Sequence, residues 1–343
     1  MADFIEFNND QRRESINTAQ RFQAWREAAE REHGYRGSMV WDETAGRRYL
    51  LRSYYDEKGL RRQRSLGPES PETIALKQRF DEGRLDAVST RKKLDVVIGR
   101  QAAINRALGL GRVPLLTARI LRLLDRRGLL GRGLRVVGTN ALYAYEAACG
   151  VILDASVTTT EDVDLLFDSR RRLRLVGDPD LPDDTLFQLL KRADRSFTMA
   201  RQSFRARNDE GFLVDLIKPM SNPPWAKGAM KLSEGQDLEA AEIEGLVWME
   251  NAPSFQQVVI DERGFPLRMI AADPRVFAIH KLWVSSRAER DAVKRVRDRA
   301  QSLLVAKLAK THMQHLPFEP SELRMMPETV VSDALTEFER ADA

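Results

Sequence analysis

The chain has 343 residues, of which 43% are hydrophobic and 31% are charged, a composition that suits about two folded domains and excludes a disordered protein. Its net charge of +4 at pH 7 is compatible with phosphate-bearing partners but does not require them. The single cysteine, Cys149, excludes an internal disulfide framework and a cysteine-based zinc cluster. The first residues lack the apolar core of a signal peptide, and no run of about 18 apolar residues follows. We therefore expect a cytoplasmic protein that does not contact a membrane.

The N-terminal part combines helices with a small sheet. Helical spacing runs through residues 9–33. Residues 38–67 change to a period of two, and turn-forming residues at 44–46 and 56–59 divide them, so we predict a three-stranded antiparallel meander. The meander is rich in arginine and tyrosine, namely Arg47, Arg48, Arg52, Arg61, Arg62, Arg64, Tyr49, Tyr54 and Tyr55. These residues can form a nucleic-acid surface or a solvated sheet face, and their alternation favours the solvated face.

Helix-start signals follow the meander. Ser70-Pro71-Glu72 predicts a helix that continues with interruptions to about residue 110, and a second helix follows from Pro114. Residues 1–130 are therefore predicted to form a helical module that contains the meander.

The centre of the chain carries a pair of carboxylates on a predicted strand. An apolar strand from Leu134 ends at Gly138-Thr139 and opens into a helix, and the next strand carries Asp162 and Asp164. Because side chains alternate along a strand, both carboxylates lie on the same face, while the residues beside them are apolar. Such a pair is hard to explain as surface decoration, and it predicts a metal site.

A third carboxylate follows on a predicted hairpin. Residues 197–207 and 212–219 are expected to be its strands, joined by a turn at 208–211. Asp215 stands on a face suited to burial, and burying an ionised carboxylate alone is costly. Its partner can be an arginine, or a metal shared with Asp162 and Asp164.

The connections and the C-terminal part have weaker patterns. A basic run at 169–175 and a loop at 177–184 precede a predicted helix over 185–197. A loop is expected at 221–230, and the apolar runs at 245–250 and 256–262 are predicted to be strands. Asp273-Pro274 then begins a helical tail with a basic polar side, which is expected to be mostly solvated while one or two of its residues reach the acidic pair. The basic residues are Lys281, Arg287, Arg290, Lys294, Arg295 and Arg297. His312 and His315 have a spacing that can ligate a metal, but no further ligands lie near them in the sequence.

The order of these elements resembles the nucleotidyltransferase superfamily of the DNA polymerase beta type. The resemblance covers residues 134–219, where a Gly-Thr turn, a D-x-D strand and a third aspartate follow one another, although serine is commoner than threonine in the turn. The sequence as a whole is also similar to bacterial nucleotidyltransferase-fold proteins of uncharacterised role. The resemblance implies an α+β fold in which a mixed sheet is flanked by helices. This core would occupy residues 131–272, followed by a C-terminal helical region at 273–343.

The resemblance also implies an activity and a site. A metal-dependent nucleotidyltransferase would move a nucleoside monophosphate from a nucleoside triphosphate, such as ATP, to a hydroxyl of RNA (tRNA included), of a protein or of a small molecule. Two Mg²⁺ ions would neutralise the triphosphate and stabilise the attacking and leaving oxygens. The implied residues are Asp162, Asp164 and Asp215 as metal ligands and catalytic residues, Gly138 and Thr139 as phosphate-binding residues, and Lys281 as a phosphate contact or a structural residue.

A second hypothesis keeps the fold without catalysis. The chain would then be a nucleotide-sensing or nucleic-acid-binding component of a toxin-antitoxin or phage-defence system, and the arginine-rich and tyrosine-rich meander motivates this reading. The three acids favour the enzyme, because a scaffold has no physical need for clustered negative charges. The sequence carries no coiled-coil heptad that would indicate an oligomer.

Overall fold

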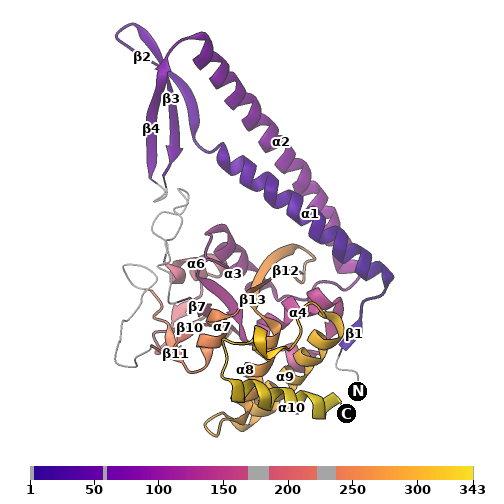
Figure 1. Ribbon diagram of the computed structural model, residues 1–343. Helices are drawn as coiled ribbons and strands as arrows, with labels where there is room; N and C mark the ends of the chain where they lie inside the picture. Colours follow the sequence, from indigo (N-terminus) through magenta and orange to yellow (C-terminus); the bar gives the residue numbers. More distant parts are fainter. Residues whose placement is uncertain (1–3, 57–59, 169–184, 222–236, 343) are drawn as a thin grey trace.

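The computed structural model describes residues 4–56, 60–168, 185–221 and 237–342. It has the predicted α+β fold, in which a mixed sheet is flanked by helices and a long arm rises from the body (Figure 1). No helix in these ranges is long and apolar enough to cross a membrane.

The arm is a helical hairpin with a small sheet at its far end (Figure 1). Its helices are α1 (Asn9–Gly34) and α2 (Pro71–Ala107), and its strands are β2 (Ser38–Thr44), β3 (Arg47–Tyr55) and β4 (Arg61–Pro68). The strands pair as an antiparallel meander in the order β2-β3-β4, which confirms the prediction. Both helices begin with a capping box, at Asn8 and at Ser70, which satisfies backbone donors that the first turn leaves unpaired.

A buried polar network attaches the arm to the body. The Asn105 side chain accepts hydrogen bonds from Thr18 Oγ1 at 2.8 Å and from Gln101 Nε2 at 3.0 Å. Its own Nδ2 donates to the Gly264 carbonyl at 2.9 Å. Gly264 has φ +86°, and a Cβ there would lie 2.0 Å from the Ala102 carbonyl oxygen. Only glycine therefore permits this close approach of arm and body.

The central sheet is mixed, and the parallel strands β7 (Asp162–Phe167) and β10 (Leu213–Pro219) lie next to each other within it. Its other strands are β5 (Leu134–Val137), β8 (Thr198–Met199), β9 (Arg205–Arg207), β11 (Ala241–Ile243), β12 (Ser254–Ile260) and β13 (Pro266–Ala272). They follow the order β12-β13-β5-β7-β10-β9-β8, and β11 pairs with β10. Strands β7 and β10 run parallel, whereas β5 and β9 are antiparallel to their inner neighbours. A separate pair joins β1 (Phe4–Glu6) to β6 (Val151–Leu153).

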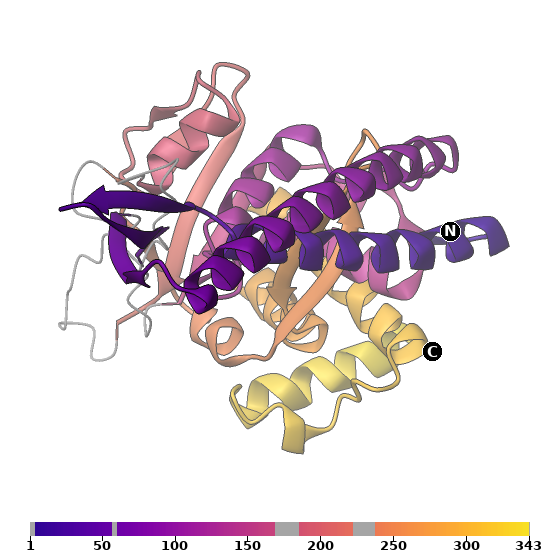
Figure 2. The same ribbon diagram turned by 90° about the horizontal axis from the view of Figure 1, so that it is seen from above.

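Helices cover the sheet and close one continuous core. They are α3 (Leu115–Arg126), α4 (Leu142–Cys149), α5 (Ala155–Thr158), α6 (Leu186–Ala193), α7 (Leu246–Asn251), α8 (Pro274–Ser286), α9 (Ala292–His312) and α10 (Glu328–Asp342), with 3₁₀ turns at Gly138–Ala141 and Pro320–Glu322. Seen from above, α1 and α2 cross over the body and α10 lies at its outer edge (Figure 2). Strand residues such as Leu165 and helix residues such as Phe277 are fully buried together, so burial of these apolar faces stabilises the body.

Two predictions of local structure were wrong. Residues 245–250 were expected to be a strand, but they form α7, which Gly245 begins at φ +81°. Its buried residues Leu246, Met249 and Glu250 have helical spacing, a pattern that a short apolar run does not distinguish from a strand. The strand expected over 197–207 is two short strands, β8 and β9, separated by a turn.

Other predictions had the right element. The helix predicted over 70–110 is the uninterrupted α2, the run at 256–262 contains most of β12, and β9 with β10 forms the predicted hairpin. The predicted helix over 185–197 is α6, which ends earlier, at Ala193. The basic run at 169–175, the loop at 177–184 and nearly all of the loop at 221–230 lie outside the described residues. The division into regions at residues 130 and 272 stays a prediction.

Candidate active site

Three aspartates line up on one face of the central sheet. Asp162 and Asp164 lie on β7 on either side of Val163, which is fully buried. Asp215 on β10 lies directly opposite Asp164 in the parallel register of the two strands. Since directly opposed residues share a face of the sheet, the structure brings the three predicted acids together.

The central carboxylate of this row has a perturbed pKa. Burial and the neighbouring charges of Asp162 and Asp215 raise the pKa of Asp164 to about 7, and the cations Lys281 and Arg290 oppose this shift only in part. A carboxylate crowded by like charges favours its protonated form unless a cation is bound nearby. The row is therefore an electrostatic environment that a metal ion would stabilise.

The predicted glycine turn packs directly against the acids. Gly138 follows β5 with φ +63°, and a Cβ at this position would lie 2.1 Å from Asp164 Oδ2. Both the left-handed backbone and the space demand glycine. Asn140 in the same turn donates from Nδ2 to the Asp162 carbonyl at 2.6 Å, and the hydroxyl of Thr160 donates to the Asp162 carboxylate. The turn and the start of β7 are thus held together.

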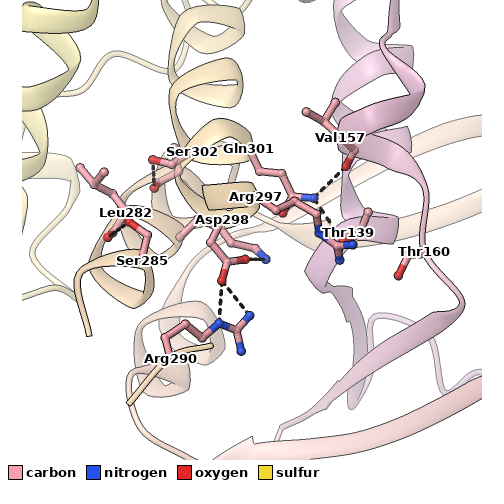
Figure 3. Close-up of polar contacts among 12 residues, drawn as sticks. Thr139, Val157, Thr160, Leu282, Ser285, Arg290, Arg297, Asp298, Gln301 and Ser302 are labelled. Carbon is pink, nitrogen blue, oxygen red and sulfur yellow. Dashed lines mark hydrogen bonds and ion pairs between the residues drawn. The ribbon is translucent and has the colours of Figure 1, made fainter. Parts of the chain in front are cut away.

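The hydroxyl of Thr139 has partners within the protein. Thr139 is buried, and its Oγ1 accepts hydrogen bonds from Arg297 Nη2 at 2.9 Å and from Gln301 Nε2 at 3.2 Å (Figure 3). Gln301 also donates to the Val157 carbonyl at 2.8 Å. Arg297 is one of the basic residues of the tail from which a contact to the site was expected, whereas sequence reasoning missed Gln301. Their spacing of four residues on α9 places them on one face of that helix, which is the signal that could have found Gln301.

Lys281 belongs to a buried ionic cluster beside the acids. Its Nζ donates to Asp298 Oδ1 at 2.6 Å. Arg290 donates from Nε to Asp298 Oδ2 at 2.8 Å (Figure 3). Two cations thus share one buried carboxylate, so the cluster carries a net positive charge. The positive charges of Lys281 and Arg290 oppose the rise in the pKa of Asp164. Arg290 belongs to the basic side of the tail that the sequence identified, whereas Asp298 was missed because its role depends on how α8 and α9 pack.

Asp215 is bound by an arginine from the neighbouring strand. Arg205 lies opposite Asp215 in the β9–β10 register, and its Nε and Nη2 donate to Oδ1 and Oδ2 at 2.7 Å and 2.6 Å. This hydrogen bonding raises the pKa of Arg205. Of the two partners that the sequence left open for Asp215, the structure shows the arginine. A two-point contact of this kind fixes both carboxylate oxygens.

The three aspartates can supply part of the oxygen ligands that a magnesium ion requires. No group of three His, Cys, Asp or Glu side chains is placed to hold a metal ion within the part of the chain that the structure describes. Mg²⁺, however, is commonly bound by one or two carboxylates together with substrate phosphates. Asp162 and Asp164, which are half-buried and share a face, fit this requirement. Asp215 would fit only after Arg205 releases it.

Arginines of the meander and the histidine His312, which the sequence also offered as candidates, contact other residues of the protein away from the acidic row. In the meander, Arg48 pairs with Glu69 at 2.8 Å and Arg62 with Asp56 at 2.8 Å, at the end of the arm far from the central sheet (Figure 1). His312 Nδ1 lies 2.7 Å from the hydroxyl of its neighbour Thr311. Within the described ranges, neither group contributes to a metal site.

Comparison with known proteins places these features in a family. A family model described as Nucleotidyltransferase matches residues 116–327, which include every candidate residue of the acidic row, the glycine turn and the ionic cluster. Searches among curated proteins and among solved structures found no significant match.

Proposed function

This chain belongs to the nucleotidyltransferase family, and we propose that it moves a nucleoside monophosphate from a nucleoside triphosphate to an acceptor hydroxyl with the help of magnesium. The observation that carries the proposal is the shared sheet face of Asp162, Asp164 and Asp215, with the Gly138 turn packed against it. Burying three acids side by side is costly, and binding of a cation and a triphosphate would offset that cost.

The reaction is a displacement at the α-phosphorus of the triphosphate. The acceptor oxygen forms a new bond to this phosphorus, and the bond from the phosphorus to the oxygen that bridges the α- and β-phosphates breaks. Pyrophosphate leaves with that electron pair. We propose that the hydroxyl proton passes to the Asp215 carboxylate once Arg205, which binds both of its oxygens in the free chain, has turned away.

The carboxylates also provide the proposed metal ligands. Asp162 and Asp164 would hold one Mg²⁺, and Asp215 would join a second ion once Arg205 turns away. When bound, the ions neutralise the phosphates and stabilise the attacking and leaving oxygens. Since a carboxylate must be ionised to coordinate a metal, Asp164 would release its proton on binding.

The cations of α8, of α9 and of the connection between them provide the proposed triphosphate site. Lys281 and Arg290 already act on the charge of Asp164. Arg297 contacts the turn through Thr139, and its guanidinium has further donors that can reach a phosphate. The backbone N–H groups of the turn at Gly138 can add to this site. Together they place positive charge on the side of the acids formed by β5 and α9.

Transfer of label tests the proposal. The full chain is incubated with α-³²P-labelled nucleoside triphosphates, magnesium and separate pools of RNA, protein and small hydroxyl compounds. Asp162→Asn should abolish transfer, whereas the control Glu161→Gln, which alters an exposed neighbouring acid, should preserve it. Equal transfer by Asp162→Asn would reject the assigned site. Nucleotide binding without transfer by the unmodified chain would favour the non-catalytic hypothesis.

A further inference from the structure

A hollow lined by arginines lies at the edge of the central sheet next to the acidic row. It has a volume of about 410 Å³, and the residues that line it include Thr198, Arg201, Gln202, Arg205 and Arg207. We call it the cationic hollow. No acidic side chain is among its lining residues in the described part of the chain.

The strand register connects the cationic hollow to the reaction centre. Arg205 lies opposite Asp215, which lies opposite Asp164. Two residue pairs further along, Arg207 lies opposite Leu213, which lies opposite Asp162. Opposed residues share a face, so the arginines and the acids form two adjacent rows on the same side of the sheet. The hollow therefore opens beside Asp215, the proposed acceptor of the hydroxyl proton.

The arginines of the hollow differ in their partners. Arg205 is bound to Asp215. Arg201 and Arg207 are exposed, and neither has a carboxylate partner within the described ranges. Exposed positive charge without a partner, gathered in a concave site, favours binding of an anion. The planar guanidinium group matches the geometry of phosphate in particular.

The donor nucleotide already has cations of its own. Lys281, Arg290 and Arg297 lie on the side of β5 and α9, while the cationic hollow lies on the opposite side, at β8 and β9. The acids stand between the two positive regions. In an in-line displacement the acceptor hydroxyl approaches the α-phosphorus on the side opposite the leaving pyrophosphate. If the cations near β5 and α9 bind the triphosphate, the cationic hollow is placed to bind the acceptor.

We propose that the cationic hollow binds the phosphodiester backbone next to the 3′ end of a single-stranded nucleic-acid acceptor, an assignment that rests on the proposed nucleotidyl transfer. Arg205 and Arg207 are two residues apart on a strand, so they are roughly 7 Å apart. Successive phosphates of an extended nucleic-acid strand have a similar spacing. Thr198 and Gln202 add a hydroxyl and an amide for phosphate or ribose oxygens, and Leu213 adds an apolar surface.

Binding of a labelled single-stranded RNA with a free 3′ hydroxyl tests this inference without chemistry. Fluorescence anisotropy is measured at several salt concentrations with the full chain carrying Asp162→Asn. Adding Arg201→Gln and Arg207→Gln should weaken binding by about tenfold or more, since charge-assisted contacts are lost. The slope of log affinity against log salt should fall by about 1.4, because each phosphate contact to a single strand contributes about 0.7.

A matched control separates a local effect from a general loss of charge. Arg79→Gln with Arg100→Gln removes the same charge from exposed positions on α2 and should leave affinity and slope unchanged. Equal slopes for the hollow variant and its parent would overturn the inference.

A transfer assay distinguishes this inference from the proposed function. In the catalytically intact chain, Arg201→Gln with Arg207→Gln should raise the KM for RNA and leave the KM for the nucleoside triphosphate unchanged. Transfer to protein or to small molecules that these substitutions do not affect would overturn the nucleic-acid acceptor while preserving nucleotidyl transfer. Absence of transfer to every acceptor would reject the proposed function, and the anisotropy measurement would still decide whether the hollow binds RNA.

Discussion

Replacing Asp164 with asparagine should stabilise the metal-free protein at neutral pH. The pKa of this carboxyl lies at about 7 instead of 3.8, because burial and the two neighbouring aspartates disfavour its charge. Asparagine has nearly the same shape and no charge. The substitution therefore removes the repulsion within the acidic row while preserving the packing against Gly138.

The sign and size of the effect follow from proton binding. Below pH 3.8 the carboxyl is protonated in both the folded and the unfolded chain. Between pH 3.8 and about 7 the unfolded chain loses this proton and the folded chain keeps it, so the free energy of unfolding decreases as pH rises. At about 1.4 kcal/mol per pKa unit, the full loss above pH 7 is about 4 kcal/mol. This is an upper bound, because Asp164 is only half-buried by surface area and keeps some hydration.

Urea denaturation in EDTA at a series of pH values measures this effect. The difference in free energy of unfolding between Asp164→Asn and the unmodified chain should grow from near zero at acid pH to its maximum above pH 7. Glu161→Gln, at an exposed neighbouring position, should give a curve parallel to that of the unmodified chain. A difference that does not change with pH would refute the reasoning. Magnesium should stabilise the unmodified chain and have little effect on Asp164→Asn.

Three further predictions concern the turn, the arginine pair and the arm. Gly138→Ala should destabilise the chain by roughly 1–3 kcal/mol more than Gly150→Ala in thermal melts, because both glycines have φ +63° but only a Cβ at 138 overlaps a carboxylate. Arg205→Gln should free Asp215 and allow a second Mn²⁺ to bind, as counted by electron paramagnetic resonance; an unchanged number of ions would exclude Asp215 from metal binding. Asn105→Ala should cost about 2 kcal/mol in urea melts, since it removes the buried hydrogen bonds that attach the arm, and an unchanged midpoint would contradict this role.

Positively charged residues lie on both sides of the acidic row. Positive Arg205 is followed by negative Asp215 and by Asp164, whose charge is suppressed, and the cations of α8 and of the connection to α9 lie beyond. Arg205 binds both oxygens of Asp215, the carboxylate that we propose as a metal ligand. Metal and arginine are therefore expected to compete for the same carboxylate.

Patterns among residues that are close in the sequence predicted several helices, strands and turns of this protein. Side-chain alternation placed Asp162 and Asp164 on one face of a strand. Turn residues defined the meander, helical spacing predicted α1, and a start signature at Ser70 marked the start of α2. These features depend on residues a few positions apart, so they can be read without knowing how the chain folds.

Only the tertiary structure decided which partners these residues meet. Arg205 binds Asp215 because of the cross-strand register, and Arg297 reaches Thr139 across a separation of 158 residues. Lys281 turned out to share Asp298 with an arginine. Each contact depends on how distant elements pack, and neither periodicity nor propensity carries that information. The sequence therefore identified the three acids, while packing determined which cations surround them.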